Sequence, residues 1–193
     1  MKQKKVIFFI IICLWVNCKK ENIEKNSSNE IQNLKLEESK KILMERSSSN
    51  FPLQGYASVN EAVKQFLIEV RNSNQVDSVE LKSLVNQKEK DYILYPNILG
   101  YGTSLDVTPI DDYNKMIRSF EVLALTKLKE KQYKEVDLKS LKILVKSVQD
   151  YGKSKFHKIG MVIVTTPKGR VEITEIRSVI QLGNRYKVAI LSP

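Results

Sequence analysis

Cysteine is the residue type in this sequence whose position most clearly suggests chemistry. The chain has 2 Cys, of which Cys13 lies inside an apolar run and Cys18 lies directly after it. A thiolate is a good nucleophile and can form a thioether with an alkylating group. If the segment before Cys18 is removed, the remaining protein has a single thiol at its first residue and cannot form an internal disulfide. A lone thiol at that place indicates that the thiol itself is used.

Other residue types that commonly do chemistry are sparse. There is 1 His, His157, and a lone imidazole without cysteine partners does not make a metal site. Asp111 and Asp112 are neighbours, so on a helix they do not share a face, and both are typical of a first helical turn. No phosphate-binding glycine loop or serine nucleophile motif occurs. The sequence predicts no catalytic residue, no metal and no cofactor, with His157 or a buried carboxylate as the candidate if the protein is an enzyme.

Three tyrosines lie in the stretch from residue 92 to residue 103, namely Tyr92, Tyr95 and Tyr101. One proline and two glycines interrupt this stretch, which predicts an irregular segment that turns while it packs on the domain. A tyrosine joins an apolar ring to a polar tip, which suits a pocket mouth or a recognition loop. These three are the candidate ligand-binding residues, and the alternative is a loop whose rings cover the core.

The leading segment predicts where in the cell the protein lies. Lysines precede an unbroken apolar run from Val6 to Val16. At about 1.5 Å per residue this run is too short to cross a hydrocarbon core of about 30 Å. It has the length of the apolar region of a signal peptide.

The end of this run, Leu14-Trp15-Val16-Asn17-Cys18, resembles a bacterial lipobox, with Trp15 where leucine is commonest and Asn17 where glycine or alanine is. The resemblance implies a diacylglyceryl group on the Cys18 thiol, cleavage before Cys18 and acylation of the new amine, for instance by palmitate. It thus implies a lipoprotein of the bacterial cell envelope, held by its acyl chains on the periplasmic, outer-membrane or surface side. A secretory signal cleaved elsewhere and an uncleaved anchor are the alternatives.

The rest of the chain divides into a tether and one domain. We assign residues 1–17 to the signal peptide, 18–50 to the lipidated cysteine and a flexible tether, and 51–193 to a single domain. The tether is rich in Lys, Glu, Asn and Ser and is too polar to fold alone, with a weak helix expected over residues 34–46.

The formal charge is +10, from 32 Lys+Arg and 22 Asp+Glu. Lysine outnumbers arginine, which argues against nucleic-acid recognition and fits mild attraction to anionic lipid or polysaccharide.

Helix signals fill the first half of the domain. A capping box at 58–61 begins a predicted helix over 59–72, whose apolar residues recur on one face. A second, shorter helix is predicted over 77–85, followed by a loop or frayed turn at 86–91. Thr108, as N-cap before a proline, begins a third helix that runs to about residue 129.

Strand signals fill the second half. Apolar and β-branched segments at 143–148, 158–166, 171–180 and 186–191 predict strands, the third with a bulge near Glu175. Short turns join the last three segments, which predicts an antiparallel meander. The chain is therefore expected to have an α+β fold, with N-terminal helices packed on a curved antiparallel sheet of three to four strands and one face of the sheet in water.

This element order, together with the closing segment at 182–188 (LGNRYKV), resembles the nuclear-transport-factor-2-like superfamily of cone-shaped domains. The resemblance implies a cone cavity, but that group includes both enzymes and non-enzymatic exported domains. We expect a non-catalytic binding or interaction module, with an envelope protein or polysaccharide as partner. The alternatives are a small-ligand carrier or small enzyme that uses the cavity, and a structural spacer. A cavity with a buried polar cluster favours the carrier or enzyme, and a solid core with an exposed tyrosine patch favours the interaction module.

Overall fold

The computed structural model describes residues 29–73, 81–131, 141–166 and 169–193. The predicted signal peptide, Cys18, the start of the tether, the first part of the predicted 77–85 helix and the Pro167-Lys168 turn lie outside the described residues.

The capping box predicted at residues 58–61 begins helix α2, Val59–Asn72, and this prediction is confirmed. The Ser58 hydroxyl accepts from the backbone N–H of Glu61 at 3.1 Å. The Glu61 carboxylate in turn accepts from the N–H of Ala57, one residue earlier than the standard box would have it. The N–H groups of Glu61 and Ala57 are thus satisfied, and the apolar face of α2 is buried.

The helix predicted from Thr108 is α5, Ile110–Glu130. Pro109 occupies the N-cap position in place of Thr108, so the helix starts one residue later than expected. Asp111 and Asp112 lie in the first turn, where their charges favour the positive end of the helix dipole.

Residues 81–98 differ from the prediction in two ways. The described part of the predicted 77–85 helix is not helical, because Leu84 forms a parallel bridge with Val188 of the sheet. Residues 87–98, expected as a loop and an irregular segment, form one continuous helical run made of α3 (Gln87–Glu89), η1 (Lys90–Leu94) and α4 (Tyr95–Ile98).

The middle part of this run, η1, is a π-helix, and its wider turn makes room for the proline that follows in α4. Pro96 has no N–H and would crowd the carbonyl four residues earlier in a regular helix. In η1 the N–H of Tyr95 donates to the carbonyl of Lys90, five residues back, so the turn is wider. A short 3-10 turn, η2 (Ser104–Asp106), completes the connection to α5.

The sheet is curved, open and antiparallel, and the predicted α+β class is confirmed. It has five strands, one more than the upper end of the prediction: β1 (Lys142–Tyr151), β2 (Ser154–Thr166), β3 (Gly169–Ile173), β4 (Ile176–Leu182) and β5 (Arg185–Leu191). Their order is β1-β2-β4-β5, and β3 also pairs with β2. The segment predicted as one strand over 171–180, with a bulge near Glu175, is divided into β3 and β4 at residues 174–175, where the buried Glu175 pairs with Lys131 at 2.8 Å.

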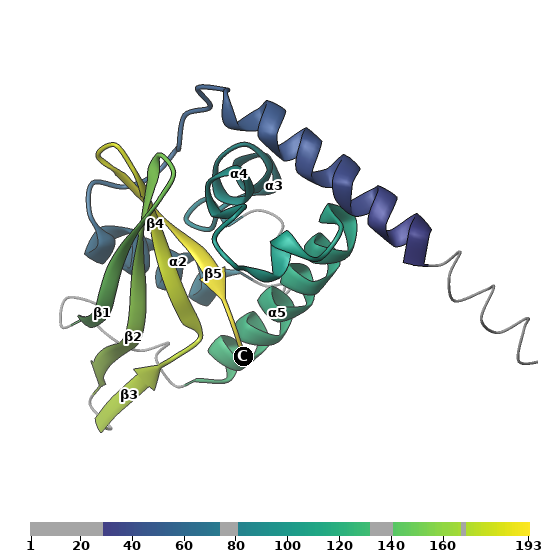
Figure 1. Cartoon of the computed structure of the whole chain (residues 1–193). Helices are drawn as coiled ribbons and strands as arrows, with labels where there is room; N and C mark the ends of the chain where they lie inside the picture. The colour runs from purple at the N-terminus through teal and green to yellow at the C-terminus, as the bar shows by residue number, and fades with distance from the viewer. Residues whose placement is uncertain (1–28, 74–80, 132–140, 167–168) are drawn as a thin grey trace, which may run out of the picture.

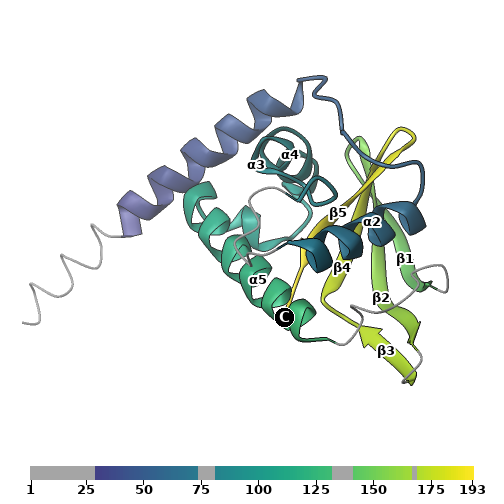
Figure 2. The same cartoon turned by 180° about the vertical axis from the view of Figure 1, so that it is seen from behind.

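Helices cover both faces of the inner strands, as Figures 1 and 2 show from opposite sides. Val179 and Val188 enter one core cluster with α2 and the end of α5. Ile180 and Ala189, one position along each strand, enter a second cluster with η1, α4 and the start of α5. The predicted water-facing side of the sheet is therefore restricted to the outer strands, since most residues of β1 are exposed.

Residues 29–47 form a helix that lies along the top of the domain in Figure 1. It is longer than the weak helix expected over 34–46 and lies in the region assigned to a flexible tether. Leu43 is 1% exposed and belongs to the second core cluster. The Ser39 hydroxyl accepts from the N–H of Ile110 at 3.1 Å, so this helix is attached to the start of α5.

Candidate binding cleft

The three candidate tyrosines have three different environments. Tyr95 is fully buried, and its hydroxyl donates to Asn114 Oδ1 at 2.7 Å. Tyr92 stacks on Phe51 with ring centroids 5.3 Å apart, and Tyr101 packs edge-on against a tyrosine of the sheet.

These tyrosines therefore do not form one exposed patch. Only Tyr92 and Tyr101 reach the surface, at 36% and 53% exposure. Burial, and after it the neighbouring Tyr113, raise the pKa of Tyr95, which keeps its hydroxyl a neutral donor.

His157 and the two aspartates show no acid–base arrangement. His157 Nε2 lies 2.9 Å from the carbonyl oxygen of the Gln181 side chain, whose amide nitrogen donates to a backbone carbonyl. This orientation means that Nε2 is the protonated nitrogen. Asp112 pairs with Lys115 at 3.0 Å on the surface, and Asp111 is exposed in the same turn.

Two buried ion pairs lie beneath the helical run of residues 87–98. Glu89 accepts from Lys187 of β5 at 2.6 Å, and Lys90 donates to Glu121 of α5 at 2.6 Å. All four side chains are at most 8% exposed. Since i and i+1 positions of a helix point in different directions, adjacent residues of opposite charge reach different partners.

The Glu89–Lys187 pair is structural, because the Glu89 carboxylate also binds backbone N–H groups from other segments. One carboxylate oxygen accepts from Lys187 and also from the N–H of Asn86, while the other accepts from the N–H of Gln54 at 3.3 Å. Asn86 completes a capping box by accepting from the N–H of Glu89. This one carboxylate thus joins the start of α3, residue 54 and the strand β5.

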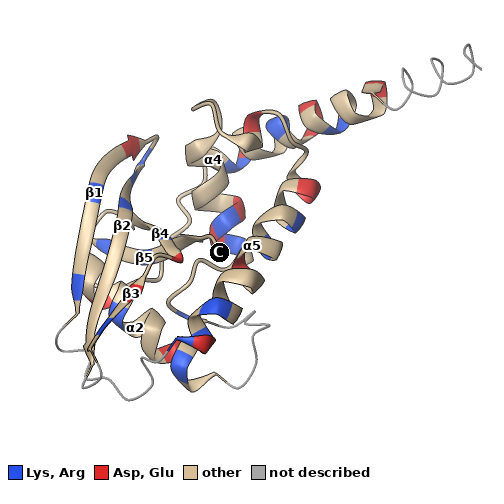
Figure 3. Cartoon of the chain, turned by 90° about the horizontal axis from the view of Figure 1, so that it is seen from below, with Lys and Arg blue, Asp and Glu red and all other residues tan. Residues whose placement is uncertain are grey.

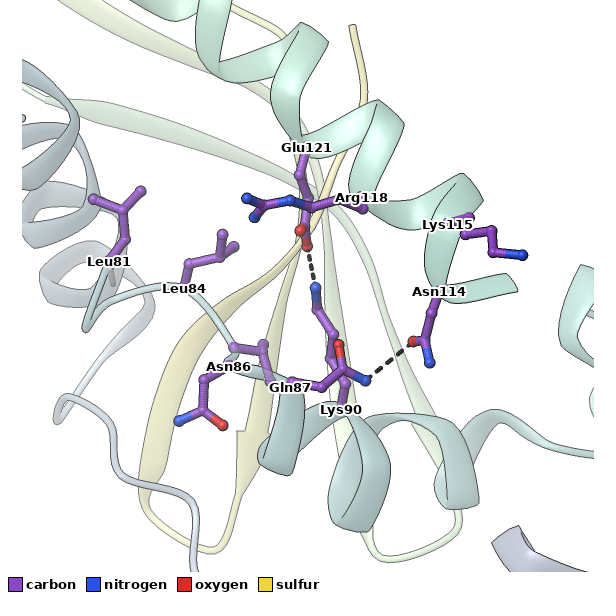
Figure 4. A pocket seen from close by; sticks show the side chains of 10 residues that line it. Leu81, Leu84, Asn86, Gln87, Lys90, Asn114, Lys115, Arg118 and Glu121 are labelled. Carbon is purple, nitrogen blue, oxygen red and sulfur yellow. Dashed lines mark hydrogen bonds and ion pairs between the residues drawn. The ribbon is translucent and has the colours of Figure 1, made fainter. Parts of the chain in front are cut away.

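The second pair, Lys90 and Glu121, lies at a cleft between residues 81–90 and α5 (Figure 4). The cleft has a volume of about 420 Å³. Leucine and valine side chains line one part of it, and amide and charged side chains line the rest: Leu81, Leu84, Val85, Asn86, Gln87, Lys90, Asn114, Lys115, Arg118 and Glu121.

Amide side chains on opposite helices hold the cleft together. The Gln87 side-chain nitrogen donates to Asn114 Oδ1 at 3.1 Å, across from α3 to α5 (Figure 4). Asn114 also accepts from Tyr95, as described above, and Gln87 donates to Asp91. The separation of the two walls is therefore fixed by hydrogen bonds as well as by packing.

The Lys90 ammonium group is the part of the cleft most suited to a ligand. An ammonium has three N–H donors, and Lys90 uses one on Glu121. Among the described residues no second acceptor contacts it. A hydrogen-bond acceptor in the cleft would complete this coordination, while the leucines offer an apolar surface beside it.

No sequence pattern pointed to Glu89 or Lys90, because residues 86–91 have the composition of a solvated loop. A signal was nevertheless present for Glu121. It lies four residues after Ile117 and four before Leu125, in the buried stripe of α5. A charged side chain at such a position needs a buried partner.

Comparison with protein-family models, with curated proteins and with solved structures found no match to this chain. In the described parts of the chain no helix is long and apolar enough to span a membrane. Nor do these parts gather three or more His, Cys, Asp or Glu side chains in a way that would suit a metal ion.

Proposed function

We propose that this protein is a lipid-anchored lipoprotein of the bacterial cell envelope whose domain binds a small ligand without catalysis. The observation that supports a ligand site is the cleft with the buried Lys90–Glu121 pair at its base. The support for the anchor is the pattern of Leu14 to Cys18 after a short apolar run.

A cleft with a buried charged pair favours the small-ligand carrier over the tyrosine-based interaction module. Tyr95 is inaccessible, and Tyr92 and Tyr101 pack against different neighbours. The cleft lies between α3, η1 and α5, whereas a cone-type cavity would lie against the concave face of the sheet. A volume of about 420 Å³ is within the usual range for small-molecule sites.

The lining indicates the class of ligand. Lys90 offers N–H donors at the base, Arg118 adds positive charge, and Leu81 and Leu84 form an apolar wall. A molecule with a carboxylate and a short apolar part matches all three features. Glu121 is already paired, and the described residues that line the cleft include no second carboxylate and no serine, threonine or cysteine, so we propose binding without chemistry.

Pentanoate is a suitable first probe, with pentylamine as a control ligand of the same tail and opposite charge. We expect the full chain in lipid nanodiscs to bind pentanoate and not pentylamine in calorimetric titrations. Gln87→Trp places a large ring in the cleft and should abolish binding, whereas Lys88→Trp, the neighbouring exposed position outside the lining, should retain it. No pentanoate binding by the wild type, or equal binding by the two variants, would contradict the proposal.

A further inference from the structure

A second cleft lies on the other side of Asn86. Unlike the first cleft, whose lining includes Glu121, its described charged lining residues are all basic. Its volume is about 620 Å³, and it lies between residues 53–56, residues 82–86 and the start of β5. The lining includes Lys82, Arg185 and Lys187, and none of the described residues that line it is acidic. Lys187 is paired with Glu89, but no described lining residue offsets the charges of Lys82 and Arg185, which favours an anion in this groove.

Lys187 gives this cleft a fixed, buried donor. Its side chain is 4% exposed and donates one N–H to Glu89 at 2.6 Å. The other two N–H groups contact no acceptor in the described part of the chain, and the residue lines the cleft. The Lys187 ammonium group therefore has donor capacity beyond its bond to Glu89.

Lys82 and Arg185 add two exposed cations at the rim. Neither forms an ion pair with a described carboxylate, and Arg185 donates one N–H to the carbonyl of Gly55 at 3.4 Å. Glu69, on the neighbouring helix α2, accepts from both the N–H and the hydroxyl of Ser83, at 2.9 and 2.5 Å. That carboxylate is held by Ser83 and also contacts the Tyr56 side chain of the lining, but Glu69 does not itself line the groove.

We propose that this second cleft binds a phosphate-type oxyanion, carried either by a soluble molecule or by a lipid headgroup. The Arg185 guanidinium supplies a planar pair of donors, Lys82 a mobile charge and Lys187 a fixed donor, which together match the several acceptor oxygens of a phosphate. This site does not depend on the ligand proposed for the first cleft, since only Asn86 lines both.

The first test is calorimetric titration of the full chain in neutral-lipid nanodiscs with inorganic phosphate at constant ionic strength. We expect saturable binding at one site. Lys82→Gln with Arg185→Gln should weaken it by roughly tenfold or more, because each lost contact is charge-assisted. Lys158→Gln with Arg177→Gln removes the same charges from exposed positions on β2 and β4 and should leave the affinity unchanged.

Non-saturating heats in the wild type, or the same loss in both double variants, would overturn the proposal, as both indicate general electrostatic attraction. All four positions are exposed, so urea midpoints close to that of the wild type should confirm that the variants are folded. The pentanoate titration of the same samples shows whether the first cleft is intact, so the two proposals can fail separately.

Two phosphate esters then distinguish the sources of the anion. Glycerol 3-phosphate represents a soluble monoester, and dihexanoyl phosphatidylglycerol represents a lipid diester. Binding of the monoester alone assigns the site to a soluble ligand, and binding of the diester, lost in the Lys82/Arg185 variant, assigns it to a headgroup. Binding of neither, with inorganic phosphate also unbound, contradicts the assignment.

Discussion

At the scale of single residues, the interior of this domain depends on two neighbours of opposite charge that do not neutralise each other. Glu89 is paired with Lys187 and is surrounded by backbone donors. Lys90 is paired with Glu121 and has a cleft on its open side. The same kind of ion pair is thus a closed structural contact in one case and the base of a candidate site in the other.

Removing one partner of the second pair should be much more costly than removing both. Glu121→Ala leaves the Lys90 ammonium buried without a counter-charge, and we expect a loss of about 3–5 kcal/mol in the free energy of unfolding. Lys90→Met combined with Glu121→Leu removes both charges and should recover most of that loss. Urea denaturation of the full chain measures both.

Asp112→Ala is the matched control, because the pair of Asp112 and Lys115 also links two residues of opposite charge but is exposed. It should change the free energy of unfolding by less than about 1 kcal/mol. A loss of that small size for Glu121→Ala would mean that Lys90 is well hydrated from the cleft and that the pair is not a structural element.

At the scale of elements, a close packing contact joins the β1–β2 hairpin to the helical run above it. Gly152 and Gly183 each stand first in a two-residue turn and have positive φ angles, 55° and 59°. A Cβ atom on Gly152 would lie 2.3 Å from Asn97 Oδ1, whereas one on Gly183 would meet nothing within 4 Å. Asn97 also accepts from the N–H of Lys153 at 2.6 Å.

Alanine at both glycines separates this contact from backbone strain. Gly183→Ala should cost about 1 kcal/mol in the free energy of unfolding, the usual penalty for a left-handed alanine. Gly152→Ala should cost more, because it has the same strain and also displaces Asn97. Thermal or urea unfolding of the two variants gives the difference directly, and equal losses would show that Asn97 moves aside freely.

Local signals explain how much of the fold was predictable. The Ser58 cap and the stripe behind it gave α2 its bounds, and β-branched runs gave the strands, because each depends on neighbouring residues alone. The run from Gln87 to Ile98 was missed because the composition of Pro96 and its neighbours suggested a break, while the wide π turn that accommodates the proline has no sequence signature.

The candidate site was less predictable than the fold. The two charged partners at its base, Lys90 and Glu121, lie 31 residues apart, and no pattern along the chain connects them. The tyrosines were predicted as ligand-binding residues from their side-chain type alone, yet Tyr95 is buried in the core. The position of Glu121, a charged residue in an apolar stripe, is the sequence signal that indicates a buried pair.

At the scale of the whole molecule, the anchor and the domain can be tested together. We expect the full chain, expressed in a bacterium fed tagged palmitate, to be labelled, because acylation of Cys18 follows from the lipobox-like pattern. Its mass should match cleavage before Cys18 plus acyl chains. Cys18→Ala should lose the label, and Cys13→Ala should keep it, since Cys13 lies in the segment to be removed.

An unlabelled wild-type chain would contradict the anchor while leaving the cleft untouched. The described charges do not offer an obvious substitute for it. Positions of both signs are interspersed along α5 and the 29–47 helix (Figure 3). Attachment to a membrane by a broad basic face is therefore not expected from these two helices.

The position of β5 near the end of the chain also determines when the domain can finish folding during synthesis. The strand receives hydrogen bonds from Tyr56 and Val85, and its Lys187 neutralises a carboxylate 98 residues earlier. Until the ribosome has added residue 187, Glu89 has no counter-charge and both core clusters lack a wall. The domain therefore completes its fold only after nearly all of it has been synthesised.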